Sequence, residues 1–278
     1  MDRSRLASLV HDMIAVSRER QLSVKSAGLA YHAFNTLVPL VILALVAVTA
    51  TDSLEVVFDT FETATGLDTA ATQSALEDVI GDGGGRLGAA VLALVIFLWS
   101  AVRMFQATNS AFTGVYGSRK RQSYLTSIVN VALLTLTVTL AIVLVAVVGV
   151  SLSLVVEGIW WRLISPLLLL ALLVGAFLPT YYLFPEADVS VREVLPGTVF
   201  TAITWTALAV SFRLYIVISD SVELFGIAGG VLIVLTWVYL GGLCVLTGAV
   251  LNAVLAGRVD PDDGWVPVVD AVSSDAAD

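Results

Sequence analysis

The sequence predicts an all-α polytopic membrane protein with six transmembrane helices. The first observation behind this prediction is composition: 58% of the 278 residues are hydrophobic and 13% are charged, with a mean hydropathy of +0.94. Soluble domains average about 45–50% apolar and about 25% charged residues. The second observation is that the apolar residues occur in blocks of about 20, the length that crosses a bilayer core. Together they exclude a soluble enzyme, a disordered protein and a disulfide-rich scaffold.

Residues 1–26 predict a cytoplasmic amphipathic segment. Basic residues alternate here with apolar residues at helical spacing, which is typical of a helix that lies on an anionic membrane surface. The basic residues are Arg3, Arg5, Arg18, Arg20 and Lys25, and the apolar ones are Leu6, Leu9, Val10, Met13 and Val16. Because the first apolar block starts only near Ala27, we expect an uncleaved first span rather than a secretory signal.

Residues 27–257 form the predicted six-span transmembrane domain. Its spans are residues 27–50, 87–105, 128–156, 163–184, 194–219 and 227–255. Pro39, Pro166 and Pro179 lie within or at the ends of spans, where neighbouring helices or hydroxyl groups can satisfy the freed backbone. The glycines of the last span, at 229–230, 241–242 and 248, predict close helix packing.

The loop at residues 51–86 predicts a helical hairpin outside the membrane. Leu54 and Phe58 share one helical face with their apolar neighbours, while Glu55 and Asp59 lie opposite. A second short helix is expected near 67–80, followed by a flexible glycine-rich hinge. Two interpretations stay open: a cap over the outer mouth of the bundle, or an interfacial hairpin with a solvated acidic face.

The distribution of basic residues predicts the orientation. Most of them lie on the side that carries both chain ends, whereas the opposite side holds Arg86, Arg162 and Arg213 among many acids. By the positive-inside rule both termini are cytoplasmic, and the protein lies in the plasma (cytoplasmic) membrane. The acidic tail at 258–278 is expected to be disordered and cytoplasmic.

The formal net charge is −9, and lysine occurs only at Lys25 and Lys120. An acidic, lysine-poor surface stays hydrated in concentrated salt, which screens its self-repulsion. A halophilic source is one hypothesis; the alternative is that one short loop happens to be acidic.

Several short patterns occur in an order and spacing that resemble one family. They are Ala-Tyr-His-Ala-Phe-Asn-Thr-Leu-Val-Pro at 30–39, the Asn…Tyr…Arg segment at 109–121, and Phe-Pro followed by Arg-Glu-Val-Leu-Pro-Gly and Trp at 184–205, with further matches at 212–215, 225–226, 237–239 and 248–252. Together they resemble the YihY/virulence factor BrkB family over about residues 10–257. His32 and Asn35 stand where that family usually has Tyr and Ser.

The resemblance implies a six-span inner-membrane protein. Members of the family have been called ribonuclease BN, linked to serum resistance, or suspected of lipid or solute export. A zinc nuclease needs several histidine or carboxylate ligands, yet the chain has only His11 and His32. The basic run Arg119-Lys120-Arg121 is typical of a positive-inside anchor. We therefore expect no catalytic residues, no metal, no cofactor and no nucleic-acid partner.

Polar groups at membrane depth are costly and tend to be functional. The candidate cavity or substrate residues are Tyr31, His32, Asn35, Asn130, Arg213 and Asn252. His32 and Asn35 share one helix face, where they either line a cavity or hydrogen-bond to a neighbouring helix. Arg213 either pairs with an acid such as Asp220 or contacts an anionic head group or substrate.

These residues favour a transporter or exporter of a lipid-like or small anionic compound, with membrane lipids as partners. A non-transporting scaffold for envelope or lipid organisation is the alternative, and a membrane enzyme is a third. A polar-lined cavity between spans would favour transport, a fully packed apolar bundle the scaffold, and clustered carboxylates the enzyme.

Overall fold

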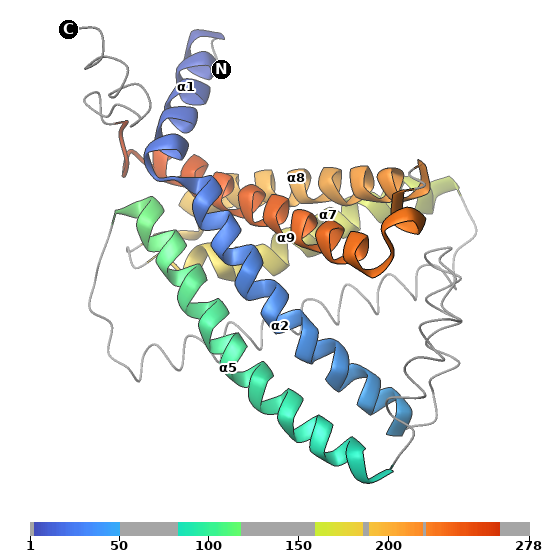
Figure 1. The fold of residues 1–278 in the computed structure, drawn as a ribbon. Coiled ribbons are helices and arrows are strands. Elements are labelled where there is room, and N and C mark those ends of the chain that lie inside the picture. The colour runs from blue at the N-terminus through green and yellow to red at the C-terminus, as the bar shows by residue number, and fades with distance from the viewer. Residues whose placement is uncertain (1–2, 51–82, 118–158, 186–188, 219–220, 262–278) are drawn as a thin grey trace, which may run out of the picture. The chain divides into compact units, whose positions relative to one another are not determined.

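The computed structural model describes residues 3–50, 83–117, 159–185, 189–218 and 221–261. Within these ranges the chain is α-helical apart from short turns, as Figure 1 shows, and this confirms the predicted all-α class. The helices are α1 (Arg3–Glu19), α2 (Leu22–Ala50), α5 (Gly83–Tyr116), α7 (Ile159–Leu183), α8 (Val191–Ile218) and α9 (Ser221–Leu255).

Four helices of the described residues are long and apolar enough to cross a membrane. The segments are Leu22–Ala47, Ala90–Tyr116, Val191–Phe212 and Gly229–Leu255, and α7 contains the shorter apolar segment Leu170–Leu183. These four segments and the apolar segment of α7 coincide with five of the six predicted spans. The predicted span at 128–156, residues 51–82 of the predicted external hairpin and most of the acidic tail lie outside the described residues.

The ends of α5 correct two sequence predictions. The helix begins at Gly83, so residues 83–86 are helical rather than the end of a loop with a glycine hinge. It continues to Tyr116, well past the predicted end of the span at residue 105, because Phe112, Val115 and Tyr116 are buried and hold its last turns in place. The helix stops at Gly117, whose φ of +67° is the left-handed conformation that glycine favours at a helix end.

A tight turn separates α1 from α2. Gln21 adopts a φ of +51°, which ends α1 and lets α2 begin at once at Leu22. The Lys25 ammonium donates a hydrogen bond to the Arg20 carbonyl, one of the carbonyls that a helix end leaves unpaired. Its side chain also lies against Gly114 of α5, where a Cβ atom would come within 2.8 Å of Lys25 Cε.

The chain divides into two compact units. The first comprises Met1–Ala30 and Ala107–Asp278, and the second Tyr31–Gln106, so that α2 and α5 each continue from one unit into the other. Within the first unit α8 lies beside both α7 and α9, and α1 contacts α9 (Figure 1).

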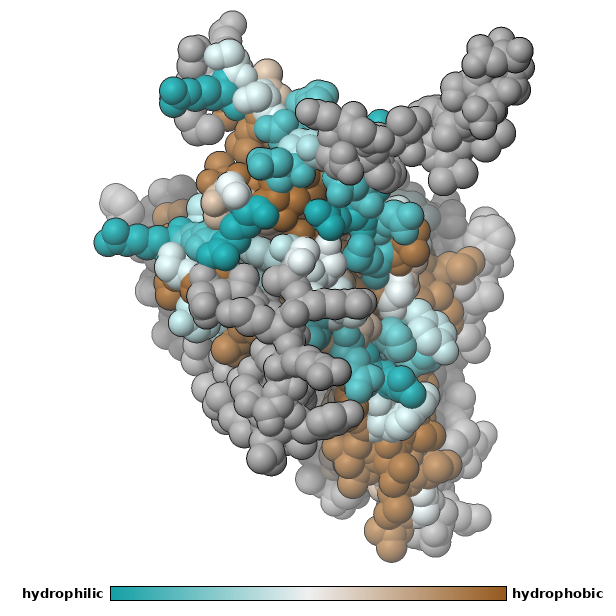
Figure 2. Space-filling view, turned by 90° about the vertical axis from the view of Figure 1, so that its left-hand side faces the viewer, coloured by the Kyte–Doolittle hydropathy of each residue, from teal (hydrophilic) through white to brown (hydrophobic). Residues whose placement is uncertain are grey.

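The second unit exposes most of its large apolar side chains. On α5, Leu92 and Leu98 are more than half exposed, whereas the small residues Ala93 and Ser100 are buried. Figure 2 shows one face on which hydrophobic residues gather at the lower end, while hydrophobic and hydrophilic residues are interspersed above it. Soluble proteins rarely leave large contiguous apolar surface open to water, so these faces suit contact with lipid.

Candidate functional site

In the described part of the first unit, α8 and α9 approach each other closely through two glycines. A Cβ atom on Gly197 would lie 2.1 Å from the Gly248 carbonyl oxygen. A Cβ atom on Gly248 would lie 2.2 Å from Thr201 Oγ1 and 2.5 Å from the Tyr181 hydroxyl. Only glycine allows this approach, the usual basis of tight helix packing in membranes.

Asn252 fastens the same contact with its side-chain amide. Its oxygen accepts a hydrogen bond from the Gly197 N–H at 2.6 Å, and its nitrogen donates to the Val194 carbonyl at 2.9 Å. The side chain is fully buried. These two bonds to the α8 backbone give this candidate residue a packing role.

Tyr181 ties α7 into the same contact. Its hydroxyl donates to the Val245 carbonyl at 2.6 Å and also hydrogen-bonds to the hydroxyl of Thr201. Thr201 Oγ1 in turn lies 3.2 Å from the Cys244 carbonyl. The buried hydroxyls of Tyr181 and Thr201 thus both find an acceptor, which offsets the cost of burying them. We call the set Tyr181, Gly197, Thr201, Gly248 and Asn252 the three-helix lock.

A second connection joins the start of α8 to the end of α9. The last turn of α9 closes with Gly257 at φ +61° and a hydrogen bond from the Arg258 N–H to the Ala253 carbonyl at 2.9 Å. This is the Schellman arrangement. It directs the Arg258 guanidinium onto both carboxylate oxygens of Glu193, with Nη2 3.1 Å from Oε2.

Aromatic rings fill the space around the lock. Phe112 of α5 packs edge-on against Tyr181 at 5.5 Å and stacks with Phe184 at 5.4 Å. Trp205 of α8 makes edge contacts with Phe177 and Trp237. Arranged edge to face, such ring pairs add about 0.5–1.5 kcal/mol beyond their area. The lock and its rings make the first unit a firmly packed frame.

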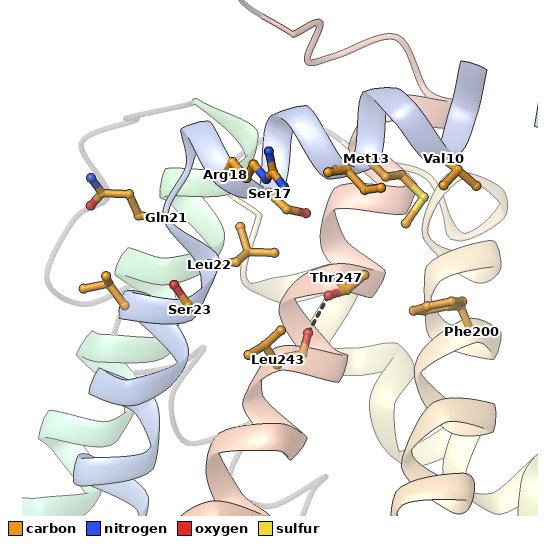
Figure 3. A pocket seen from close by; sticks show the side chains of 12 residues that line it. Val10, Met13, Ser17, Arg18, Gln21, Leu22, Ser23, Phe200, Leu243 and Thr247 are labelled. Carbon is orange, nitrogen blue, oxygen red and sulfur yellow. Dashed lines mark hydrogen bonds between the residues drawn. The ribbon is translucent and has the colours of Figure 1, made fainter. Parts of the chain in front are cut away.

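A groove of about 810 Å³ lies against this frame. It is formed by α1, the first turns of α2, and the flanks of α8 and α9 (Figure 3). Its apolar lining residues are Val10, Met13, Ile14, Leu22, Val24, Phe200 and Leu243, and its polar ones are Ser17, Arg18, Gln21, Ser23 and Thr247. This groove, defined by these residues, is the candidate functional site.

The polar groups of the groove are unevenly distributed. Figure 3 shows Ser17, Arg18 and Gln21 at or near the turn between α1 and α2, whereas Phe200 lies on α8 and Leu243 on α9. Thr247 directs its hydroxyl to the Leu243 carbonyl at 2.7 Å, so it is satisfied within α9. The groove therefore joins a polar, cationic end to an apolar wall.

The structure brings two of the predicted site residues together. Tyr31 and His32 meet edge to face with ring centres 5.3 Å apart, and the Tyr31 side chain is 62% exposed. Asn35 follows one turn later on α2, half-buried like His32. These three residues belong to the second unit, and Asn252 to the first.

Two predicted site residues are not placed. Arg213 belongs to α8, but its side chain lies outside the described part, and Asn130 falls in the undescribed range. In α5, the exposed Arg103 guanidinium lies 5.5 Å from the centre of the Trp99 ring and makes a cation–π contact. Among the described residues, no group of three or more His, Cys, Asp or Glu side chains could hold a metal ion.

Sequence reasoning identified part of the lock and missed the rest. Close packing was predicted for Gly248 and is confirmed, whereas a Cβ atom on Gly230 would meet nothing within 4 Å. Gly197 and Thr201 were missed, although small residues four apart on α8 facing Gly248 and Asn252 on α9 are a recognisable packing signal. The groove carried no such signal, because its walls come from four helices.

Comparison with known proteins places the chain among membrane proteins. The family model described as Virulence factor BrkB matches residues 13–266. The ribonuclease-like protein YfkH of Bacillus subtilis (strain 168) is 26% identical over 255 residues, which cover 84% of this chain and 90% of that protein.

Other relatives match over shorter stretches. A UPF0761 membrane protein of Pseudomonas aeruginosa (strain LESB58) is 42% identical over 83 residues, 30% of this chain and 20% of that protein. The UPF0761 membrane protein AZOSEA40600 of Aromatoleum aromaticum (strain DSM 19018 / LMG 30748 / EbN1) is 26% identical over 175 residues, 60% of this chain and 43% of that protein. No solved structure matches the chain. Because the family model covers most of its length, the chain belongs to the virulence factor BrkB family of membrane proteins.

Proposed function

We propose that this protein spans the cytoplasmic membrane six times, with both termini in the cytoplasm, and that it exports a lipid-like anionic compound. One observation carries the proposal: the groove against α1 combines an apolar wall with a single cationic end. Sites for small molecules are typically apolar cavities of about 300–1,000 Å³ with a few convergent polar groups. An amphipathic compound matches that combination better than a small hydrophilic solute does.

The proposed orientation places the groove at the cytoplasmic face. Arg18 lines this end of the groove, and the basic residues Arg20 and Lys25 follow it in the chain. In this orientation α1 lies along the inner leaflet, whose anionic lipids attract each nearby basic residue by about 1 kcal/mol. A lipid-like substrate would thus enter from the leaflet that α1 contacts. Because the sequence carries no nucleotide-binding motif, we expect the gradient of the lipid itself to drive its crossing.

Reconstituted vesicles test the proposal. The purified chain is incorporated into liposomes that contain a trace of head-labelled fluorescent phosphatidylglycerol, and a membrane-impermeant reductant reports how fast label crosses the bilayer. We expect crossing well above that in protein-free liposomes. Val10→Trp should slow it by filling the groove, whereas Leu232→Trp, an exposed position of α9 outside the groove, should not. Equal rates with and without protein would refute export of this lipid class.

A non-transporting scaffold is the second candidate, and the three-helix lock favours it. The lock has one glycine on each of the helices α8 and α9, and its amide and hydroxyl groups are hydrogen-bonded within it. Such a contact is suited to a rigid structural protein. A scaffold requires no lipid crossing. Equal rates of lipid crossing with and without the protein, together with envelope defects in cells that lack the protein, would favour the scaffold over the exporter.

The proposal does not include ribonuclease activity, in spite of the printed name of YfkH. A metal-independent ribonuclease needs a general acid–base pair next to a basic phosphate groove. The histidines are His11 and His32, and His11 is an exposed residue of α1 next to Asp12. Purified protein should show no RNA cleavage above a mock preparation; cleavage abolished by His32→Ala would contradict this.

A further inference from the structure

The geometry points to a binding site for one phospholipid in the groove against α1, with its anionic head group on Arg18 and an acyl chain along Phe200 and Leu243. This inference rests on the proposed function and deepens it, because it names the ligand class and the residue that selects it. Three features of the groove lead to this assignment: its charge, its hydrogen-bonding groups and its apolar wall.

Charge is the first feature. Among the residues that line the groove, Arg18 is the only charged one, so no carboxylate opposes an anion there. In the described part of the chain no acidic group pairs with the Arg18 guanidinium. Its neighbours differ: Arg20 lies 3.4 Å from the Glu19 carboxylate, and Lys25 is bonded to the Arg20 carbonyl. Arg18 is thus the charged group that the groove leaves available to a ligand.

Hydrogen-bonding groups are the second feature. Ser17 lies beside Arg18 at the end of α1, and Ser23 follows at the start of α2, whereas Gln21 at the turn points away from Arg18 (Figure 3). A guanidinium with a hydroxyl group beside it can contact more than one oxygen of a phosphate ester.

The apolar wall is the third feature and selects a lipid over a free anion. Phe200 and Leu243 contribute half-buried side-chain surface without hydrogen-bonding groups, and the Thr247 hydroxyl is already bonded within its helix. Inorganic phosphate would contact only the polar end of the groove and leave this wall uncovered. An acyl chain covers it, and burial of each methylene group strengthens binding.

Lipid retention on the full-length protein tests the site. The chain is equilibrated in vesicles of equal phosphatidylglycerol and phosphatidylcholine, extracted in mild detergent, and its retained lipids are counted by native mass spectrometry. We expect one phosphatidylglycerol to be retained preferentially. Arg18→Gln should weaken its retention about fivefold, the factor that one basic residue near an anionic head group provides. Arg5→Gln, also exposed on α1 but outside the groove, is the matched control.

Filling the groove gives the second arm. Leu243→Trp should abolish retention of both lipids, because it occupies the apolar wall. Val10→Trp fills the groove from the 53% exposed side of α1 and so preserves the packing of α8 against α9. If Leu243→Trp fails to fold, the Val10→Trp variant still tests whether the groove binds lipid. Leu232→Trp, 64% exposed on α9, should retain lipid as the unmodified chain does.

Three results would overturn the site. They are undiminished phosphatidylglycerol preference in Arg18→Gln, undiminished retention in Val10→Trp, and displacement of the lipid by inorganic phosphate at equal concentration. The last would identify a free-anion site. Failure of the proposed export is a separate outcome: retention without lipid crossing in liposomes would refute export and preserve the site, whereas crossing without retention would refute the site alone.

Discussion

Replacing Gly248 by alanine tests the three-helix lock most sharply. The added Cβ atom would lie 2.2 Å from Thr201 Oγ1, 2.5 Å from the Tyr181 hydroxyl and 2.7 Å from the Gly197 carbonyl oxygen. Real Cβ atoms do not approach other heavy atoms so closely, so α8 and α9 must separate or the hydroxyl groups must move. Either response disturbs the hydrogen bonds that Tyr181 makes to Thr201 and Val245.

The expected loss follows from three contributions. Overpacking costs about 1–3 kcal/mol. Each interhelical hydrogen bond weakened in a membrane protein costs about 0.6 kcal/mol on average. Alanine in place of glycine inside a helix returns about 1 kcal/mol. The net effect is a loss of about 1–3 kcal/mol of unfolding free energy.

Gly230→Ala is the matched control, because it makes the same chemical change in the same helix. A Cβ atom there meets nothing within 4 Å, so only the gain in helix propensity applies. Thermal unfolding in detergent, followed by tryptophan fluorescence, should show a lower midpoint for Gly248→Ala and an equal or higher one for Gly230→Ala. A Gly248→Ala protein that melts at or above the unmodified chain would refute the close contact of α8 and α9.

Three further predictions use the same molecule. Asn252→Ala leaves the Gly197 N–H without its side-chain acceptor and should lower the unfolding free energy by about 1–3 kcal/mol, measured by thermal unfolding. Arg258→Gln should cost at most about 1 kcal/mol in the same assay, because its pair with Glu193 is partly exposed; a larger loss would show that the pair carries more stability than exposed pairs do. Reporter fusions at Asp68 and Asp270 should report opposite sides of the membrane, and the same side for both would refute the six-span topology.

Hydropathy predicted the helices well, because lipid imposes one simple requirement on every span. An apolar block of about 20 residues signals a helix irrespective of what it packs against. The same criterion misplaced the ends of α5. Its last turns, with Phe112 and Tyr116, are held by packing in the first unit, where Phe112 meets Tyr181 and Phe184 of a distant part of the chain. No local pattern carries that information.

The groove could not be predicted from the sequence, because it too depends on contacts between distant parts of the chain. Arg18 was identified only as one basic residue of an amphipathic helix, and Leu243 only as part of a span. They share a groove because Gln21 adopts a left-handed backbone conformation, which turns the chain between α1 and α2, and because α1 then contacts α9. A glutamine at positive φ is uncommon, and no pattern of apolar residues in the sequence predicts this backbone conformation.

Photo-cross-linking in intact membranes tests the central claim, that this protein takes up an anionic lipid at the groove. Cells expressing the chain are supplied with a diazirine-bearing phosphatidylglycerol precursor, irradiated, and the adducts are mapped by peptide mass spectrometry. We predict adducts concentrated on residues 10–24 and near Phe200 and Leu243, and their loss in Arg18→Gln. Adducts spread over exposed apolar positions such as Leu92 and Leu98 of α5, with none enriched in the groove, would contradict the claim.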